Sequence, residues 1–66
     1  MERNIHLDWP AIVKEAIKRR YEQKLTQEQL SVLANVSKPT INSFEQGKTT
    51  IKLETALKIL KFLGLS

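Results

Sequence analysis

Residues 25–47 read LTQEQLSVLANVSKPTINSFEQG and carry two helix-start signals, eleven residues apart. The first is Thr26, an N-cap residue with Gln29 at the third helical position, and this pair predicts a capping box. The second is Ser37, followed by Pro39 in the first turn, where a missing N–H leaves no helical bond unmade. Two short capped helices joined by a brief turn predict a helix-turn-helix motif.

The second predicted helix, residues 38–46, has two different sides. At 100° per residue, Ile41 and Phe44 fall together on one side and are expected to pack. The other side carries no acidic residue and consists of Lys38, Pro39, Asn42, Ser43 and Gln46. A helix of about nine residues is marginal alone, so packing must hold it, which leaves the polar side free to be presented.

The spacing of this segment resembles the Xre/Cro (lambda-repressor-like) helix-turn-helix family. The positions that match the family pattern are Leu25, Thr26, Gln27, Leu30, Val36, Ser37, Ile41, Phe44, Glu45 and Gly47. The sequence departs from the pattern at Ser31, usually Ala, and at Asn35, usually Gly, although Asn tolerates a left-handed turn. Lys24 also stands where the family usually has Gly, so it either takes a positive φ or the loop follows another path.

The length of 66 residues predicts one small domain, which buries only about 60% of its unfolded surface. We expect a loose N-terminal arm over residues 1–7 and a DNA-binding domain over 8–66, with the motif at 26–46. The resemblance implies an all-α, lambda-repressor-like fold of four helices, or of four to five.

Composition narrows the range of functions. The net charge of +4 suits a polyanionic partner. There is no cysteine, a single histidine and no Gly-rich phosphate loop, so we expect neither an enzyme nor a site for a metal or another cofactor. No apolar run reaches the length of a membrane span, and the start of the chain lacks a signal-peptide core, which favours a cytoplasmic protein without a membrane partner.

The first helix should begin after Asp8, an N-cap residue. Its apolar stripe consists of Trp9, Ile12, Val13, Ala16 and Ile17. Arg20 projects into the same stripe, where a charge must be paired. Glu45, at the edge of the packed side of the second motif helix, is the predicted partner, and members of the family often form such a pair. The alternative is that the first helix ends early and Arg20 reaches water.

A last helix is predicted to end at Gly64, with an inward stripe at i, i+3, i+4 and i+7. That stripe consists of Leu53, Ala56, Leu57 and Leu60. The side chains expected to bury together are Trp9, Ile17, Leu30, Leu33, Ile41, Phe44, Leu57 and Leu60. Three further apolar residues, Ile59, Phe62 and Leu63, either complete the core or meet a partner.

The family resemblance implies sequence-specific binding of double-stranded DNA by a transcriptional regulator such as a repressor, with the second motif helix in the major groove. It places at base-facing positions Lys38, Pro39, Asn42 and Ser43. It places near phosphates Gln27, Gln46 and Lys48, with Thr40 and Thr49 as weaker candidates. Since one short helix reads few bases, we expect a homodimer on a palindromic site, with Ile59, Phe62 and Leu63 at the contact. The alternative is a protein-interaction module such as an antitoxin, whose partner is a toxin.

Overall fold

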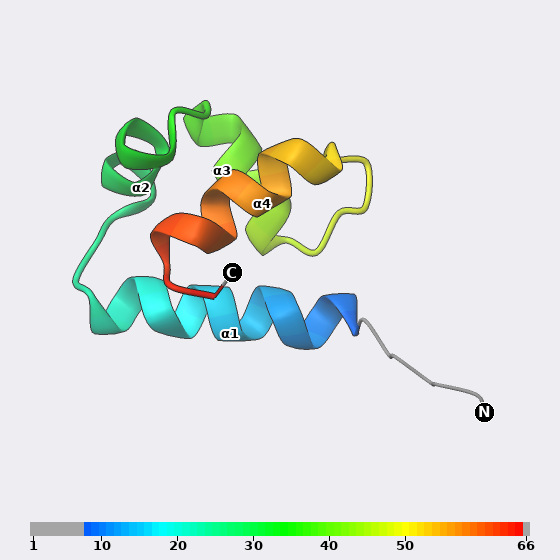
Figure 1. Cartoon of the computed structure of the whole chain (residues 1–66), viewed down its shortest axis with the longest axis horizontal. Helices are drawn as coiled ribbons and strands as arrows, with labels where there is room; N and C mark the ends of the chain where they lie inside the picture. The colour runs from blue at the N-terminus through cyan, green and yellow to red at the C-terminus, as the bar shows by residue number, and fades with distance from the viewer. Residues whose placement is uncertain (1–7, 66) are drawn as a thin grey trace.

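The structure is a computed structural model that describes residues 8–65, and it confirms the predicted all-α fold (Figure 1). The four helices are α1 (Trp9–Glu22), α2 (Gln27–Ala34), α3 (Lys38–Glu45) and α4 (Leu53–Phe62). The longest of them, α1, runs along one side of the molecule, and the other three gather on its inner side (Figure 1). Helix α2 packs against both α3 and α4, and α3 packs against α1. The arm predicted for residues 1–7 lies outside the described part of the chain.

The helix-start signals act as the sequence predicts. The Thr26 hydroxyl accepts the Gln29 N–H at 3.0 Å while the Gln29 side chain accepts the Thr26 N–H at 2.8 Å, which completes the capping box. Ser37 Oγ accepts the Thr40 N–H at 3.2 Å, the first donor available after the proline. Asp8 caps α1 in the same way. The two motif helices are therefore each fixed at their first turn by their own sequence.

All four helices end at a residue with positive φ. The residues are Lys24 (58°), Asn35 (59°), Gly47 (81°) and Gly64 (78°). After α1, the Lys24 N–H donates to the Tyr21 carbonyl at 2.9 Å and the Leu25 N–H donates to the Arg20 carbonyl at 3.0 Å. This bond pattern is a Schellman motif, and it recurs after the other three helices. Of the two paths that the sequence left open for Lys24, the chain takes the left-handed one.

Lys24→Gly is expected to raise the free energy of unfolding by about 0.5–1 kcal/mol. A left-handed conformation costs an L-residue about 1–2 kcal/mol, and glycine avoids this cost. Part of the gain is offset because glycine has more conformational freedom in the unfolded chain. Lys24 is exposed, so the substitution removes little packing. Urea denaturation measures the difference. Lys18→Gly, in the middle of α1, is the matched control and should instead lose about 1 kcal/mol; a similar loss for Lys24→Gly would contradict the prediction.

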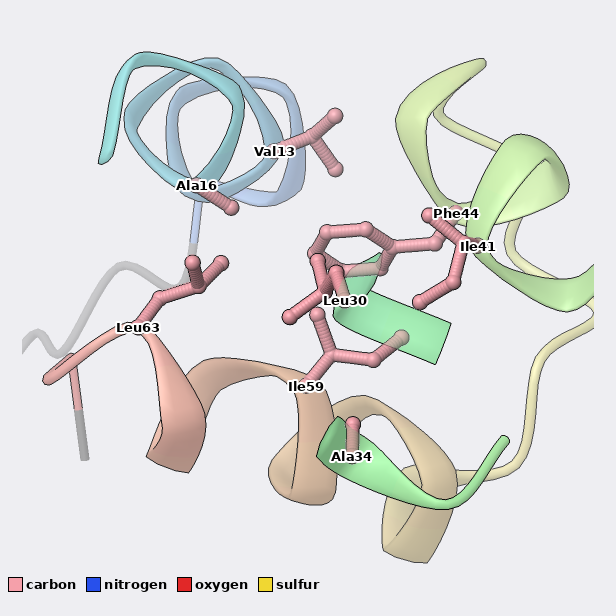
Figure 2. Packing of buried hydrophobic residues seen from close by; sticks show 8 residues of the cluster. All are labelled: Val13, Ala16, Leu30, Ala34, Ile41, Phe44, Ile59 and Leu63. Atoms are coloured by element: carbon pink, nitrogen blue, oxygen red, sulfur yellow. The ribbon is translucent and has the colours of Figure 1, made fainter. Parts of the chain in front are cut away.

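The core lies where the four helices meet. Its buried side chains are Val13, Ala16, Leu30, Ala34, Ile41, Phe44, Ile59 and Leu63, and they point toward one another (Figure 2). The rings of Trp9 and Phe44 meet in a T-shaped contact, with 5.5 Å between their centroids. The Trp9 indole N–H also donates to the Gly47 carbonyl at 3.2 Å. The start of α1 is thereby attached to the chain that leaves α3.

The predicted core is correct in part. Leu30, Ile41 and Phe44 are buried as predicted, whereas Trp9, Ile17 and Leu60 are half-buried against the cluster. The prediction was wrong for Leu33 and Leu57, which are 47% and 46% exposed. In α2 the inward positions next to Leu30 are taken instead by Ser31 and Ala34, whose small side chains let the neighbouring helices come close.

The inward side of α4 is rotated from the predicted one. Helix α4 buries Ala56 and Ile59, and Leu63 just beyond it, while Leu53 is 73% exposed. Ile59 and Leu63 belong to the core, so the prediction that they form a contact between two copies was wrong. Phe62 remains half-exposed. Any contact between the outer side of α4 and another molecule must therefore use Leu53 and Leu57, the two leucines that are exposed there.

Candidate nucleic-acid interface

Helix α3 is anchored by one side and presents the other. Ile41 and Phe44 are buried, and they fix the helix between α1 and α2. Of the four predicted base-facing residues, Lys38, Pro39 and Asn42 are exposed and Ser43 is half-buried. At 100° per residue Pro39, Asn42 and Ser43 project from the side opposite the two anchors, and Lys38 lies at the edge of that side. A helix held in this way keeps a rigid row of polar groups at the surface.

Four of the predicted phosphate-facing residues lie around the C-terminal end of α3. Gln46, Lys48 and Thr49 are exposed in the chain that leaves the helix. Gln27, the first residue of α2, is half-buried, and its side chain lies against Glu45 at the end of α3. These four residues therefore lie together at one end of the exposed side of α3.

Thr40 is placed differently, because its hydroxyl lies 2.7 Å from the Ser37 Oγ. Although this contact is exposed, it engages the hydroxyl at the helix cap, and Thr40 as a residue is half-buried. Thr40 is consequently the member of the predicted set that is least free to meet a phosphate.

One residue next to this surface did not emerge from the sequence. Thr50 lines a shallow hollow of about 240 Å³, together with Pro39, Thr40, Ser43 and Ile51. It is exposed and stands beside two of the predicted base-facing residues. The polar segment after Gly47 was the available signal, but only the path of the chain brings Thr50 back to the first turns of α3.

Arg20 and Glu45 meet beneath this surface. Arg20 Nε donates to Glu45 Oε2 at 2.6 Å and Arg20 Nη2 donates to Oε1 at 3.1 Å, with side-chain exposures of only 8% and 10%. The hydrogen bond to Glu45 raises the pKa of Arg20, and burial opposes that shift less strongly. The guanidinium is thus a permanent cation that neutralises the carboxylate. The alternative in which Arg20 reaches water does not occur.

Glu45 accepts a third hydrogen bond, and Arg20 makes another. Gln27 Nε2 donates to Glu45 Oε1 at 2.9 Å. Arg20 Nη1 donates to the Leu25 carbonyl at 2.8 Å, just before the start of α2. One ion pair therefore links the end of α1, the start of α2 and the end of α3.

The charge distribution follows from this arrangement. The single acid of α3 is turned inward, so the exposed side of the helix carries no carboxylate. Lys38 at the start of the helix and Lys48 after its end leave positive charge there, and both are exposed. Such a surface can donate hydrogen bonds to a polyanion without repelling it.

Other kinds of site are not evident in the described part of the chain. Residues 8–65 contain no group of three His, Cys, Asp or Glu side chains placed to hold a metal ion. None of the helices in this range is long and apolar enough to cross a lipid bilayer.

The family model for helix-turn-helix proteins matches residues 14–66, which is most of the chain and includes all of α2 and α3. The chain belongs to the Xre/Cro helix-turn-helix family. It is also 43% identical over 54 residues to an uncharacterized HTH-type transcriptional regulator of Haemophilus influenzae. That similarity covers 82% of this chain and 55% of the relative, so the chain spans about half the length of the curated relative that it matches.

Within the Xre/Cro helix-turn-helix family, α2 and α3 are the two helices of the motif, as the residue spacing predicts. The turn between them passes through Asn35 in the left-handed conformation, where the family usually has Gly. The family match therefore agrees with the observed geometry at the motif itself.

Proposed function

We propose that this protein binds double-stranded DNA sequence-specifically and regulates transcription, with α3 in the major groove. One observation carries the proposal: α3 is anchored by Ile41 and Phe44 and presents a polar, acid-free side, because its own acid is paired internally with Arg20. The name of the Haemophilus influenzae relative, a transcriptional regulator, supports the same function.

Direct reading of bases is assigned to the exposed side of α3. Asn42 has an amide that pairs in a bidentate manner with adenine, and Lys38 donates to the O6 and N7 atoms of guanine. Ser43 donates or accepts, while Pro39 offers apolar contact to a thymine methyl. These four residues specify sequence in the proposal.

Contacts with phosphates are assigned to the residues around the C-terminal end of α3 and to Thr40 in its first turn. Lys48 supplies charge, and Gln27 and Gln46 supply neutral donors, with Thr40 and Thr49 as lesser contributors. Such contacts fix the position of the protein on the duplex without reading sequence, and the charged ones make affinity depend on salt.

Asn42→Ala is expected to weaken binding to the preferred site by about 1–3 kcal/mol and to leave binding to random DNA nearly unchanged. The amide reads a base edge and contributes nothing to a sequence that it does not match. Duplexes selected from a random pool provide the preferred site, and titration against the selected and a scrambled duplex gives both affinities. Equal losses for the two duplexes would show that α3 does not read bases in this way.

Lys48→Ala is expected to weaken binding to all sequences alike. Loss of one phosphate contact should flatten the plot of log affinity against log salt by about 0.9. Titrations at several salt concentrations measure the slope. Lys18, on the exposed side of α1, is the control, and Lys18→Ala should leave the slope unchanged. If neither Asn42→Ala nor Lys48→Ala differs from the parent, the DNA assignment fails and the antitoxin-like alternative takes its place.

The proposal includes a homodimer on a palindromic site, because a two-fold pair doubles the bases that one short helix reads. Half-sites should lie about one helical turn, roughly 34 Å, apart. The outer side of α4 replaces the contact expected from the sequence: Leu53 and Leu57 are exposed there beside Glu54, Lys58 and Lys61. If two copies of α4 cross antiparallel at Leu57, Glu54 of one faces Lys61 of the other.

Leu57→Glu is therefore expected to abolish paired binding while the single domain stays folded. Sedimentation of the complex at saturating DNA gives the stoichiometry, and circular dichroism confirms the fold. Val32→Glu, at an exposed position of α2, is the matched control and should still bind as a pair. A parent protein that forms only a 1:1 complex on a non-palindromic site would overturn the dimer.

A further inference from the structure

Only one of the two N–H groups of the Gln27 side-chain amide is hydrogen-bonded within the described part of the chain. Its Nε2 carries two hydrogens, and one of them is donated to Glu45 Oε1 at 2.9 Å. Among the described residues this is the only hydrogen bond that the side chain makes. In a planar amide the second hydrogen points away from the first, and the half-buried Gln27 leaves part of its side chain at the surface. One donor is therefore fixed inward while the other is left for a ligand.

The backbone at the same place also has donors to offer. Gln27 is the first residue of α2, and the first N–H groups of a helix have no partner within it. The Thr26 cap satisfies the N–H of Gln29, not those of Gln27 and Glu28. The start of α2 thus offers free backbone donors and one free side-chain amide hydrogen, a combination that suits a phosphate oxygen.

The Glu45 carboxylate is itself fixed in place by hydrogen bonds from Arg20. Arg20 donates a hydrogen bond to each of its two oxygens, and a third Arg20 nitrogen donates to the carbonyl of Leu25, two residues before Gln27. These bonds close a ring that runs from Arg20 to Leu25, along the chain to Gln27, across to Glu45 and back to Arg20. The acceptor of the Gln27 amide is thus fixed in relation to the start of α2.

The ion pair also neutralises the charge that Glu45 would otherwise place near a phosphate. A bare carboxylate next to a phosphate would oppose binding. Because Arg20 neutralises Glu45 at hydrogen-bond distance, the network as a whole carries no net charge. The carboxylate can orient a neutral donor without repelling DNA.

We propose that Glu45 is a positioning residue for DNA binding, which holds the Gln27 side-chain amide so that its second N–H meets a DNA phosphate at the start of α2. This rests on the proposed function above. Binding then requires no further ordering of Gln27, since the free protein already holds the side chain in place.

A double-mutant cycle in DNA affinity tests the proposal. Gln27→Met removes the amide at nearly constant size and should weaken binding about tenfold, the value of a hydrogen bond to a charged group. Glu45→Gln replaces the charged acceptor with a neutral one that Arg20 holds less firmly, and should weaken binding about two- to tenfold, up to the effect of one side chain that must now be ordered. In the Gln27→Met background, Glu45→Gln should cause no further loss, because Glu45 has nothing left to position.

The direction of the change in DNA affinity distinguishes a positioning role of Glu45 from a simple effect of its charge. Glu45→Gln raises the net charge by one, which by itself strengthens binding to a polyanion. Glu28→Gln makes the same chemical change at an exposed neighbour of Gln27 and serves as the control; it should leave binding equal or stronger. Stronger binding by Glu45→Gln, or an equal loss in both Gln27 backgrounds, would overturn the proposal.

A second measurement needs no substitution at the ion pair and stands even if Glu45→Gln does not fold. In nitrogen-15 NMR spectra of the parent protein, one Gln27 side-chain proton should lie well downfield of its position in an unbonded amide, because it is bonded to a carboxylate. Gln27→Met identifies the pair of signals by their loss. Added duplex should move the other proton and leave the bonded one in place. Two protons at the positions of an unbonded amide in the free protein, or a bonded proton lost on binding, would contradict the proposal.

Failure of this inference can be told apart from failure of the proposed function. If the parent protein does not bind any duplex, the DNA assignment itself is wrong. If the parent binds and the cycle is additive, DNA binding stands and Glu45 has only a structural role.

Discussion

Phe44→Ala is expected to lower the free energy of unfolding by about 3–5 kcal/mol. Phe44 is 1% exposed, lies among the buried side chains of all four helices and makes the T-shaped contact with Trp9. Removal of its ring leaves a cavity that the surrounding helices cannot fill without moving. Domains of this size have a total stability of about 3–10 kcal/mol, so much of the variant should be unfolded at 25 °C.

Thermal and urea denaturation of Phe44→Ala give the loss directly. The chain offers a matched control in its other phenylalanine, Phe62, which is 49% exposed at the end of α4. Phe62→Ala should cost about 1 kcal/mol or less, as substitutions of partly exposed residues do. Equal losses for the two variants would mean that Phe44 is not the centre of the packing.

Arg20→Ala and Glu45→Ala are each expected to lower the free energy of unfolding by about 3–5 kcal/mol, because each leaves a buried charge without its partner. The double variant should lose much less than the sum, since it removes both charges together. The double variant Arg20→Met with Glu45→Leu should lose even less free energy of unfolding, because apolar side chains of similar size often replace a buried pair without loss of stability. The coupling energy from the cycle measures the interaction itself.

The neighbouring pair of Arg19 and Glu15 is the control for this cycle. Its Nε–Oε2 distance is 3.3 Å, but the side chains are 38% and 44% exposed, so the coupling should be about 0.5 kcal/mol or less. Added salt should reduce that value and leave the Arg20–Glu45 coupling nearly unchanged, because burial limits screening. Additivity at Arg20 and Glu45 would show that the contact adds nothing to stability.

Helix α4 shows where a sequence pattern is not sufficient. Two sets of residues in this segment satisfy the same i, i+3, i+4, i+7 spacing: Leu53, Ala56, Leu57 and Leu60, or Ala56, Ile59, Leu60 and Leu63. Local periodicity cannot choose between them, since both are apolar. The position of α1 decides, because Arg19 Nη1 donates to the Leu63 carbonyl at 3.3 Å and Leu63 packs beside Ala16 (Figure 2). A contact across 44 residues leaves no trace in a helical pattern.

The motif was easier to predict because its signals are local. The capping box at Thr26 and the Ser37 cap depend on neighbours three residues away, and both form as expected. The buried position of Arg20 also follows from its place in an apolar stripe. The bond from Gln27 to Glu45 does not, because it depends on the angle at which two short helices meet. Its existence is known only from the folded chain.

The tryptophan at the start of α1 gives this molecule an optical reporter. Trp9 is the only tryptophan in the chain, and its indole N–H is bonded to the carbonyl of Gly47, next to Lys48. Indole emission shifts when this hydrogen bond or the packing on Phe44 changes. The intrinsic fluorescence of the unlabelled protein therefore follows the backbone at the end of α3, and a duplex that displaces this segment will change the emission.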